Sequence, residues 1–293
     1  MALQLAMKPG DRKNAPHASA RNPGPARGVL KAAHAPAGRF HHARLAAPTT
    51  IASMIQHIWI VRWQMDDGTT HTAQTLPYPN VHLVIENGQA LIHGIHYGRF
   101  TRELAGEGAA VGVKFRPGAL FPFWRRSVSL LRNRSVAAER VFGGAVCELS
   151  REVGATGIDD ACVVAAVERF FVRHWPAEDP NVEQVASIVA AIESDRTILK
   201  VEELLSRYEC TKRSLQRLFE QYVGIGPKWV INRFRMHEAV ERLDRGEPVD
   251  WAGFAQDLGY FDQAHFNRDF KSLIGCTPKQ YATRARDIVG AGS

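Results

Sequence analysis

Cysteine pairs and long hydrophobic runs are both missing from this sequence. Its four cysteines are far apart and form no C-x-x-C motif, so we expect neither a zinc site nor a disulfide framework. These cysteines are Cys147, Cys162, Cys210 and Cys276. No apolar run approaches the roughly 18 residues needed to span a bilayer. We therefore expect a soluble, cytoplasmic protein with reduced thiols, no bound metal and no membrane partner.

The greater part of the chain also lacks an excess of either charge sign. The formal net charge is +7, but residues 1–45 contain eight basic and one acidic side chain, which already equals that excess. That segment is rich in Ala, Pro and Gly and has no apolar periodicity, so we expect a disordered basic tail over 1–45. Affinity for nucleic acid would therefore depend on a local basic face and not on the bulk charge.

Signatures of catalysis are absent as well. The sequence shows no Ser/His/Asp arrangement, no phosphate-binding glycine loop and no setting that would activate a cysteine. We expect no enzyme and no cofactor.

The region 46–176 has the pattern of an antiparallel β domain to about residue 125, followed by helices. Alternating or apolar runs predict strands at 55–63, 81–86, 90–93 and 111–115. Turn signals such as Asn87-Gly88 separate them, which favours a small sandwich or barrel. Further along, the spacing changes to that of a helix, which Asp159 is placed to cap. This is an N-terminal domain of α+β character.

A second domain over 179–288 is predicted to be entirely helical, beginning at Asp179-Pro180. It contains one short segment twice, at an offset of 51 residues. The matched pairs are Leu215 and Phe266, Arg217 and Arg268, Phe219 and Phe270, Gly224 and Gly275, Pro227 and Pro278, and Lys228 and Lys279. Each copy has the pattern of a helix-turn-helix unit, in which the second helix enters the major groove of DNA.

The outer faces of these two second helices carry the candidate DNA-binding residues. Thr211 is placed to cap the first helix and Asp262 the second. Polar side chains that can bond base edges or phosphates lie opposite the apolar stripe of each helix. The candidates are Thr211, Lys212, Arg213, Gln216 and Arg217 in the first unit, Gln263, His265, Asn267, Arg268 and Lys271 in the second, and Lys228 and Lys279 as phosphate contacts.

The segment between the two units is predicted to be a rigid helix that starts at Pro227 and ends near Gly246. About seventeen residues give a rod of roughly 25 Å. Such a rod could separate two recognition helices by nearly one DNA turn, about 34 Å, so one chain could address two successive major grooves.

From about Asp179 to Arg286 the sequence resembles the AraC/XylS family of bacterial transcription regulators. The motifs that carry the resemblance, in the family's order and spacing, are Ser214–Phe219, Gly226–Trp229, Arg233–Met236, Leu258–Phe270 and Gly275–Pro278. One departure is Gly253, where the family usually has a better helix former. At a cost of about 1 kcal/mol, a glycine there would loosen the second supporting helix.

The resemblance implies a transcription regulator whose partners are double-stranded DNA and RNA polymerase. It further implies that Arg213, Gln216 and Arg217, with Gln263, His265, Asn267 and Arg268, occupy base- or phosphate-contact positions. The N-terminal region looks like a cupin-like domain that senses a small-molecule effector, forms a homodimer, or does both.

The N-terminal motifs leave alternatives open. His93 and His96 are three residues apart and would point to opposite faces of a strand, so we favour ordinary histidines over metal ligands. Arg116 is expected to pair with an internal carboxylate or to meet an anionic effector. Beside the regulator, two other hypotheses remain: a cupin-type enzyme fused to a DNA-targeting domain, and a regulator whose N-terminal domain serves only for dimerisation.

Overall fold

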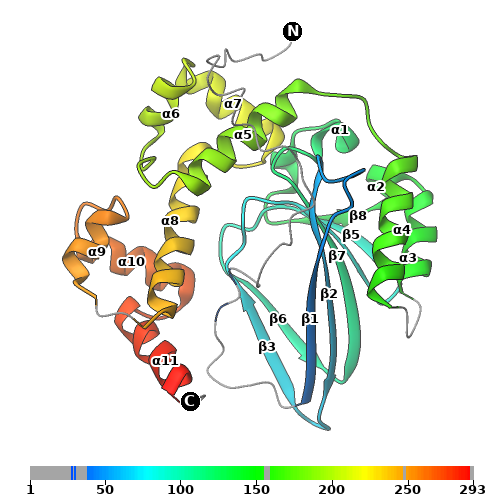
Figure 1. Ribbon diagram of the computed structural model, residues 1–293, viewed down its shortest axis with the longest axis horizontal. Coiled ribbons are helices and arrows are strands. Elements are labelled where there is room, and N and C mark those ends of the chain that lie inside the picture. The colour runs from blue at the N-terminus through cyan, green and yellow to red at the C-terminus, as the bar shows by residue number, and fades with distance from the viewer. Residues whose placement is uncertain (1–27, 29, 31–37, 155–158, 247–248, 291–293) are drawn as a thin grey trace.

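The computed structural model describes residues 28, 30, 38–154, 159–246 and 249–290. A curved sheet with helices on its outer side forms one part of the molecule, and a group of helices forms the other (Figure 1). The expected tail over 1–45 lies mostly outside the described residues. It is wrong over 38–45, because the first strand begins at Gly38.

The N-terminal domain has two antiparallel sheets. Six strands pair in the order β1-β2-β7-β4-β5-β8, and β3 pairs with β6 separately. The strands are β1 (Gly38–Ala46), β2 (Ile55–Met65), β3 (Thr70–Thr75), β4 (His82–Glu86), β5 (Gln89–His93), β6 (Phe100–Ala105), β7 (Glu107–Phe115) and β8 (Ser135–Ala137). The four strands predicted from apolar patterns are present, and they form the centre of the large sheet.

One face of the large sheet forms the core of this domain. Ile58, Val113, Leu83 and Ile92 lie side by side across four strands, and all are fully buried. On the other face Trp59 covers Gly112, where an added Cβ would lie 1.9 Å from the indole. That close approach requires glycine at this position of β7.

Short helices close the outer side of this core. They are α1 (Phe121–Trp124), the 3-10 helix η2 (Val128–Leu131), α2 (Glu139–Phe142), α3 (Ala145–Val153) and α4 (Asp160–Arg173). The ring of Phe171 on α4 packs edge-on against Phe115 at a centroid distance of 5.7 Å. Asp159 caps α4 by accepting a hydrogen bond from the backbone N–H of Cys162, which confirms the predicted start of that helix.

The C-terminal domain is all-helical. Its helices are α5 (Pro180–Ser194), α6 (Val201–Arg207), α7 (Lys212–Tyr222), α8 (Pro227–Asp244), α9 (Trp251–Asp257), α10 (Gln263–Ile274) and α11 (Pro278–Gly290). None of the described helices is both long and apolar enough to cross a membrane. With a sheet domain followed by a helical domain, the two-domain α+β architecture expected from the sequence is present.

The hydrophobic core does not divide where the chain passes from one domain to the other. One continuous cluster of buried side chains extends from the sheet through α5, α6 and α7 to Phe234 on α8. A second cluster joins the rest of α8, from Met236 onward, to α9, α10 and α11, and it also includes Leu30 and Leu76 from the N-terminal part of the chain. The first helical unit thus shares its core with the sheet, whereas the second unit is packed mainly around the later half of α8.

Candidate nucleic-acid interface

The sequence repeat is a repeat of structure. α6 and α7 form the first unit, and α9 and α10 form the second. Thr211 and Asp262, 51 residues apart, cap α7 and α10, and each accepts a hydrogen bond from the backbone N–H three residues on. Gly224 and Gly275 follow the ends of those helices with φ near +90°, a conformation that glycine adopts without strain. The matched residues therefore set where each helix starts and stops.

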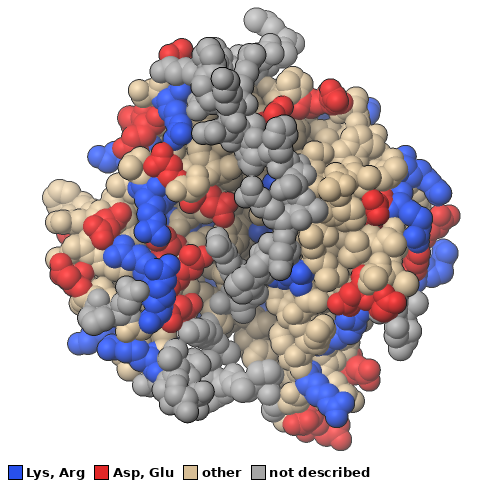
Figure 2. Space-filling view, viewed as in Figure 1, with Lys and Arg blue, Asp and Glu red and all other residues tan. Residues whose placement is uncertain are grey.

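The same offset separates buried from exposed positions in both units. Leu215 and Phe266 are fully buried, as are Phe219 and Phe270. Eleven of the twelve candidate residues are exposed, and the exception is Asn267, which is half-buried. The structure thus presents two polar helix faces from equivalent positions. Figure 2 shows basic and acidic side chains alternating over the helical domain, so the basic groups are local and form no broad patch on the face in view.

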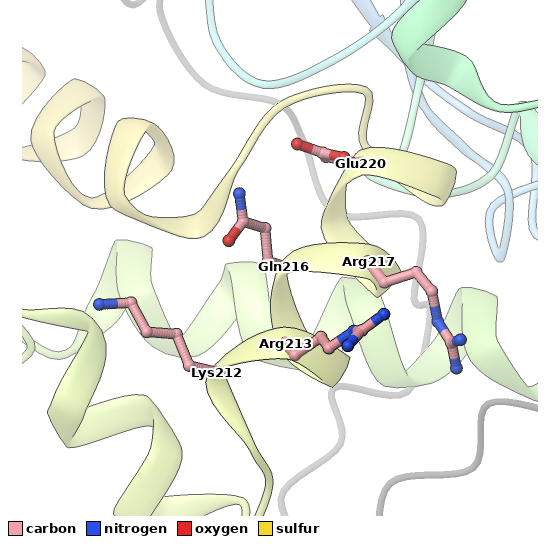
Figure 3. A pocket seen from close by; sticks show the side chains of 5 residues that line it. All are labelled: Lys212, Arg213, Gln216, Arg217 and Glu220. Atoms are coloured by element: carbon pink, nitrogen blue, oxygen red, sulfur yellow. The ribbon is translucent and has the colours of Figure 1, made fainter.

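In the first unit the candidate side chains extend from one face of α7. Figure 3 shows Lys212, Arg213, Gln216 and Arg217 fanning out from this helix, with Glu220 one turn further on. The three basic groups are exposed, so they can meet phosphate oxygens without first breaking contacts within the protein core. The Gln216 amide both donates and accepts, as base edges require.

A groove beside α7 brings Lys228 to the same surface. Lys212 and Gln216 line it together with Lys228, which lies in the first turn of α8. Three further exposed residues of this groove, Lys200, Glu202 and Asn232, were not among the sequence candidates, and Glu202 lies 3.9 Å from Lys212. Lys200 precedes α6 and Asn232 lies one turn after Lys228. Neither belongs to a matched pair of the sequence repeat, so the repeat could not identify them.

In the second unit an acidic neighbour modifies the polar face of α10. His265 Nε2 lies 3.6 Å from Asp269 Oδ2, one turn away. The same histidine packs edge-on against Tyr260, whose pKa is raised by burial and by Asp269. Gln263, Arg268 and Lys271 remain exposed. The second face is therefore less cationic than the first at its start.

Gly253 belongs to the cap of α9. Its backbone N–H donates to Asp250 Oδ2 at 3.2 Å, and a Cβ at this position would lie 2.6 Å from that oxygen. The glycine leaves room for the capping carboxylate, so its low helix propensity is offset by a satisfied helix start.

The connecting helix α8 has 18 residues and spans about 27 Å, as predicted for the rod. Two arginines on it are almost fully buried. Arg235 donates to the Ile192 carbonyl at 2.6 Å and pairs with Glu238 at 2.8 Å. Arg233 donates to the Tyr97 carbonyl of the N-terminal domain and stacks its guanidinium over Trp229. The connecting helix α8 therefore also packs against the N-terminal domain.

The N-terminal domain contacts the C-terminal end of both recognition helices. Arg132, after η2, donates through Nε and Nη2 to the Gly224 carbonyl at 3.1 and 3.0 Å. Arg99, in the loop before β6, donates to the Ile274 carbonyl at 2.7 Å. Ile274 is the last residue of α10, and its carbonyl carries the partial negative charge of a helix end, which Arg99 stabilises. The Gly224 carbonyl lies two residues after α7, so Arg132 holds the turn that follows that helix.

The arginines Arg99 and Arg132, which we call the arginine clamp, are joined by the loop around Tyr97. The Arg132 guanidinium lies over the Tyr97 ring, 5.6 Å from its centre. The backbone N–H of Tyr97 donates to Asn133 Oδ1. Because the Tyr97 carbonyl also accepts from Arg233, one loop of the N-terminal domain connects α7, α8 and α10.

The other N-terminal candidates have ordinary surroundings. No group of three or more metal-ligating side chains occurs in the part of the chain that the structure describes. His93 Nδ1 bonds to Ser135 Oγ at 2.9 Å, whereas His96 lies after the end of β5 and does not share its strand. Arg116 Nε donates to the Ala52 carbonyl at 2.6 Å, and it pairs with no carboxylate among the residues that the structure describes, which corrects the first of the two expectations for this residue.

The geometry defines a protein with two helix-turn-helix units on one rigid rod, and comparison with known families agrees. Residues 204–284 match the family described as "Helix-turn-helix domain". Residues 43–137 match a domain of unknown function, DUF6597. The first of these two matches shows that residues 204–284 form a helix-turn-helix domain, which is of the AraC type.

Two relatives of this chain are bacterial transcriptional activators. The RCS-specific HTH-type transcriptional activator RclR of Escherichia coli strain K12 is 25% identical over 144 residues, which is 45% of this chain and 50% of RclR. The HTH-type transcriptional activator RhaS of Pectobacterium carotovorum is 29% identical over 82 residues, 28% of this chain and 29% of RhaS. The chain thus spans half the length of one relative and less than a third of the other.

Among solved structures, this chain is similar to ToxT from Vibrio cholerae O395. The match covers 74% of this chain and 97% of the ToxT chain, with a TM-score of 0.36 and 13% identity. A likeness at that level supports no inference about a ligand.

Proposed function

We propose that this protein is a sequence-specific DNA-binding regulator of transcription that places α7 and α10 in successive major grooves. One observation carries the proposal: the exposed polar faces of α7 and α10 occupy equivalent positions in two repeats. A merely solvated helix face has no reason to repeat base-reading side chains at one offset. Because its target would be chromosomal DNA, the protein would act in the cytoplasm, with RNA polymerase as a further partner.

The proposal predicts which polar side chains contact DNA bases and which contact phosphates. Base edges would be read by Gln216, Arg217, Gln263 and Arg268. A glutamine amide can form two hydrogen bonds with adenine, and an arginine guanidinium can form two with guanine. The exposed lysines at 212, 228, 271 and 279 would contact phosphates and contribute affinity without sequence preference.

We further propose that the N-terminal domain governs the two units, by binding a small effector or a second copy of the chain. The arginine clamp supports this, because both recognition helices are held at one end by that domain. A change in the loop around Tyr97 would reach α7 and α10 together.

The full-length protein should select one motif from a library of randomised double-stranded oligonucleotides. Two sub-motifs about one helical turn apart, protected together in a footprint, would support the proposal. Enrichment of no motif, or of a single short one that needs only one unit, would contradict it. Thermal melting against a metabolite collection would test the sensing part, since a ligand that binds the folded state raises the melting temperature.

A further inference from the structure

Phe261 is exposed to a degree that its place in the fold does not explain. Its side chain is 90% accessible, whereas the next most exposed large apolar residue among those described, Val172, is 52% accessible. It immediately precedes Asp262, the cap of α10, and so stands at the start of the helix that we propose enters a major groove.

A structural role at the helix start belongs to the neighbouring residue instead. The residue before a helix cap often packs on the fourth residue of the helix, which here is Phe266. Phe266 is fully buried, and its ring contacts are with Tyr260, Phe254 and Phe270. Tyr260 makes this contact at a centroid distance of 5.3 Å. Tyr260, and not Phe261, therefore packs on Phe266 at the start of α10.

The turn that carries Phe261 is anchored on both sides, so the backbone position of this residue is fixed. Tyr260 donates its backbone N–H to the Ala255 carbonyl at 3.0 Å, and its side chain is half-buried. A Cβ added at Gly259, whose φ is +80°, would lie 3.2 Å from the Leu199 side chain just before α6, so the backbone of this turn runs close to that residue. On the other side Asp262 accepts from the backbone N–H of His265 at 2.7 Å. A rigid turn presents an aromatic ring at the entrance of α10.

The surroundings of Phe261 favour a base over a protein partner. Gln263 and His265, which follow it on α10, are polar and exposed, and the apolar side chain between them is the single methyl group of Ala264. The other large exposed apolar residues, such as Leu130 and Trp175, belong to other elements. An isolated ring amid groups that bond base edges fits one small apolar target, whereas a protein interface needs a contiguous patch.

The apolar group that DNA offers in its major groove is the 5-methyl of thymine. We propose that Phe261 contacts a thymine methyl group at the edge of the sub-motif read by α10. This inference rests on the proposed function. In the first unit the residue at the same offset is Cys210, which is half-buried, so the contact belongs to the second unit alone. The protein would thereby gain a thymine preference at one end of its site, which fixes its orientation on the DNA.

The test uses the full-length protein and the operator that it selects. Each thymine of the α10 sub-motif is replaced in turn by deoxyuridine, which lacks the methyl group and keeps the same hydrogen-bonding edge. One replacement should weaken wild-type binding about fourfold, the effect expected for one buried methyl group. Phe261→Ala should weaken binding to the thymine operator by at least as much and should no longer distinguish thymine from uracil.

Two matched variants serve as controls. Phe261→Leu keeps an apolar side chain and should retain part of the preference for the methyl group. Val172→Ala removes an exposed apolar side chain from α4 and should change neither binding nor the preference. Because Phe261 is exposed, its alanine variant should melt at the wild-type temperature, so a loss of binding would not reflect unfolding.

The outcomes separate this inference from the proposed function. Absence of any selected operator contradicts the function itself. If an operator is selected and Gln263→Ala weakens binding, but no uracil replacement has an effect, only the role of Phe261 is overturned. The same holds if Phe261→Ala weakens thymine and uracil operators equally, which would indicate a sugar contact. Unchanged DNA affinity together with lost regulation of transcription would assign the ring to a protein partner and overturn the inference as well.

Discussion

At the scale of single residues, side chains on the outer face of α7 differ in what they can recognise. Gln216 and Arg217 are exposed, and each can form paired hydrogen bonds with a purine edge. Replacing either by alanine should weaken specific binding by about 1–3 kcal/mol and relax the preference at the contacted base pair. Competition binding against operators with single base changes would measure both effects.

The matched control for that experiment is Arg169→Ala. Arg169 is an exposed arginine of α4 that pairs with Glu152, far from the recognition helices. Its loss should leave DNA binding unchanged. Equal losses on operator and random DNA in the Arg217 variant would assign that residue to the phosphate backbone.

Lysines at the start of α8 and α11 should act through charge alone. Lys228 and Lys279 are exposed in the first turns of these helices, at the repeat offset of 51 residues. Each alanine variant should lower the slope of log affinity against log salt by about one, with the sequence preference unchanged. Fluorescence anisotropy over a series of KCl concentrations measures the slope. Arg140→Ala removes an exposed charge from α2 and should leave it unaltered; an unaltered slope in Lys228→Ala would exclude that residue from the interface.

A buried lysine should make the stability of the protein depend on pH. Burial lowers the pKa of Lys114 from 10.5 to about 7, and its Nζ lies over the Tyr78 ring, 4.4 Å from the ring centre. Between pH 7 and 10.5 the unfolded chain holds a proton that the folded chain lacks, so the free energy of unfolding rises with pH. Each pKa unit corresponds to about 1.4 kcal/mol.

Urea unfolding at pH 7 and pH 9 should therefore show a larger increase in stability for the wild type than for Lys114→Met. The variant should be more stable than the wild type at pH 7, because it removes a group that loses its hydration on folding. Parallel pH profiles for the two proteins would show that Lys114 titrates normally.

At the scale of helices and strands, the caps allow a direct test. Asp262→Ala removes the acceptor for the His265 N–H and should destabilise the protein by about 1 kcal/mol. Asp262→Ser keeps a capping oxygen and should restore most of that stability. Chemical unfolding of both variants measures the difference. If the serine and alanine variants are equally unstable, the cap contributes nothing and another role of Asp262 must explain the loss.

The predictability of the elements follows from how much of each is buried on one face. The helices α7 and α10 could be predicted because buried residues recur at helical spacing between a cap and a glycine. The strands β1, β3 and β6 could not. β1 is mostly exposed along its first half, and β3 and β6 form a separate two-stranded sheet of largely exposed or half-buried residues. Where neither face is buried, the alternation that identifies a strand is missing.

At the scale of the whole molecule, the arginine clamp should fix the relative placement of the two units. Replacing Arg99 and Arg132 together by alanine would release the ends of α7 and α10 from the N-terminal domain. We expect the double variant to tolerate insertion or removal of one base pair between the two sub-motifs better than the wild type does. Affinities for a set of operators that differ only in this spacing would measure the effect, and an unchanged spacing preference would contradict it.

The site and the contacts between domains differ in how far they could be predicted. The candidate residues on α7 and α10 follow from the repeat, and all but the half-buried Asn267 are exposed. The clamp does not follow from any motif, because its acceptors are the backbone carbonyls of Gly224 and Ile274. Every residue carries such a carbonyl, so only the folded chain shows which ones the arginines reach.

The boundary between the two buried clusters has a consequence for protein engineering. The clusters meet inside α8, between Phe234 and Met236, and not at the passage from α4 to α5. A chimaera joined near residue 179 would cut through shared apolar packing and place Val185 and Tyr222 against a foreign surface. A junction within α8 would keep most of each cluster together, so exchange of second units between homologous regulators should yield well-folded hybrids.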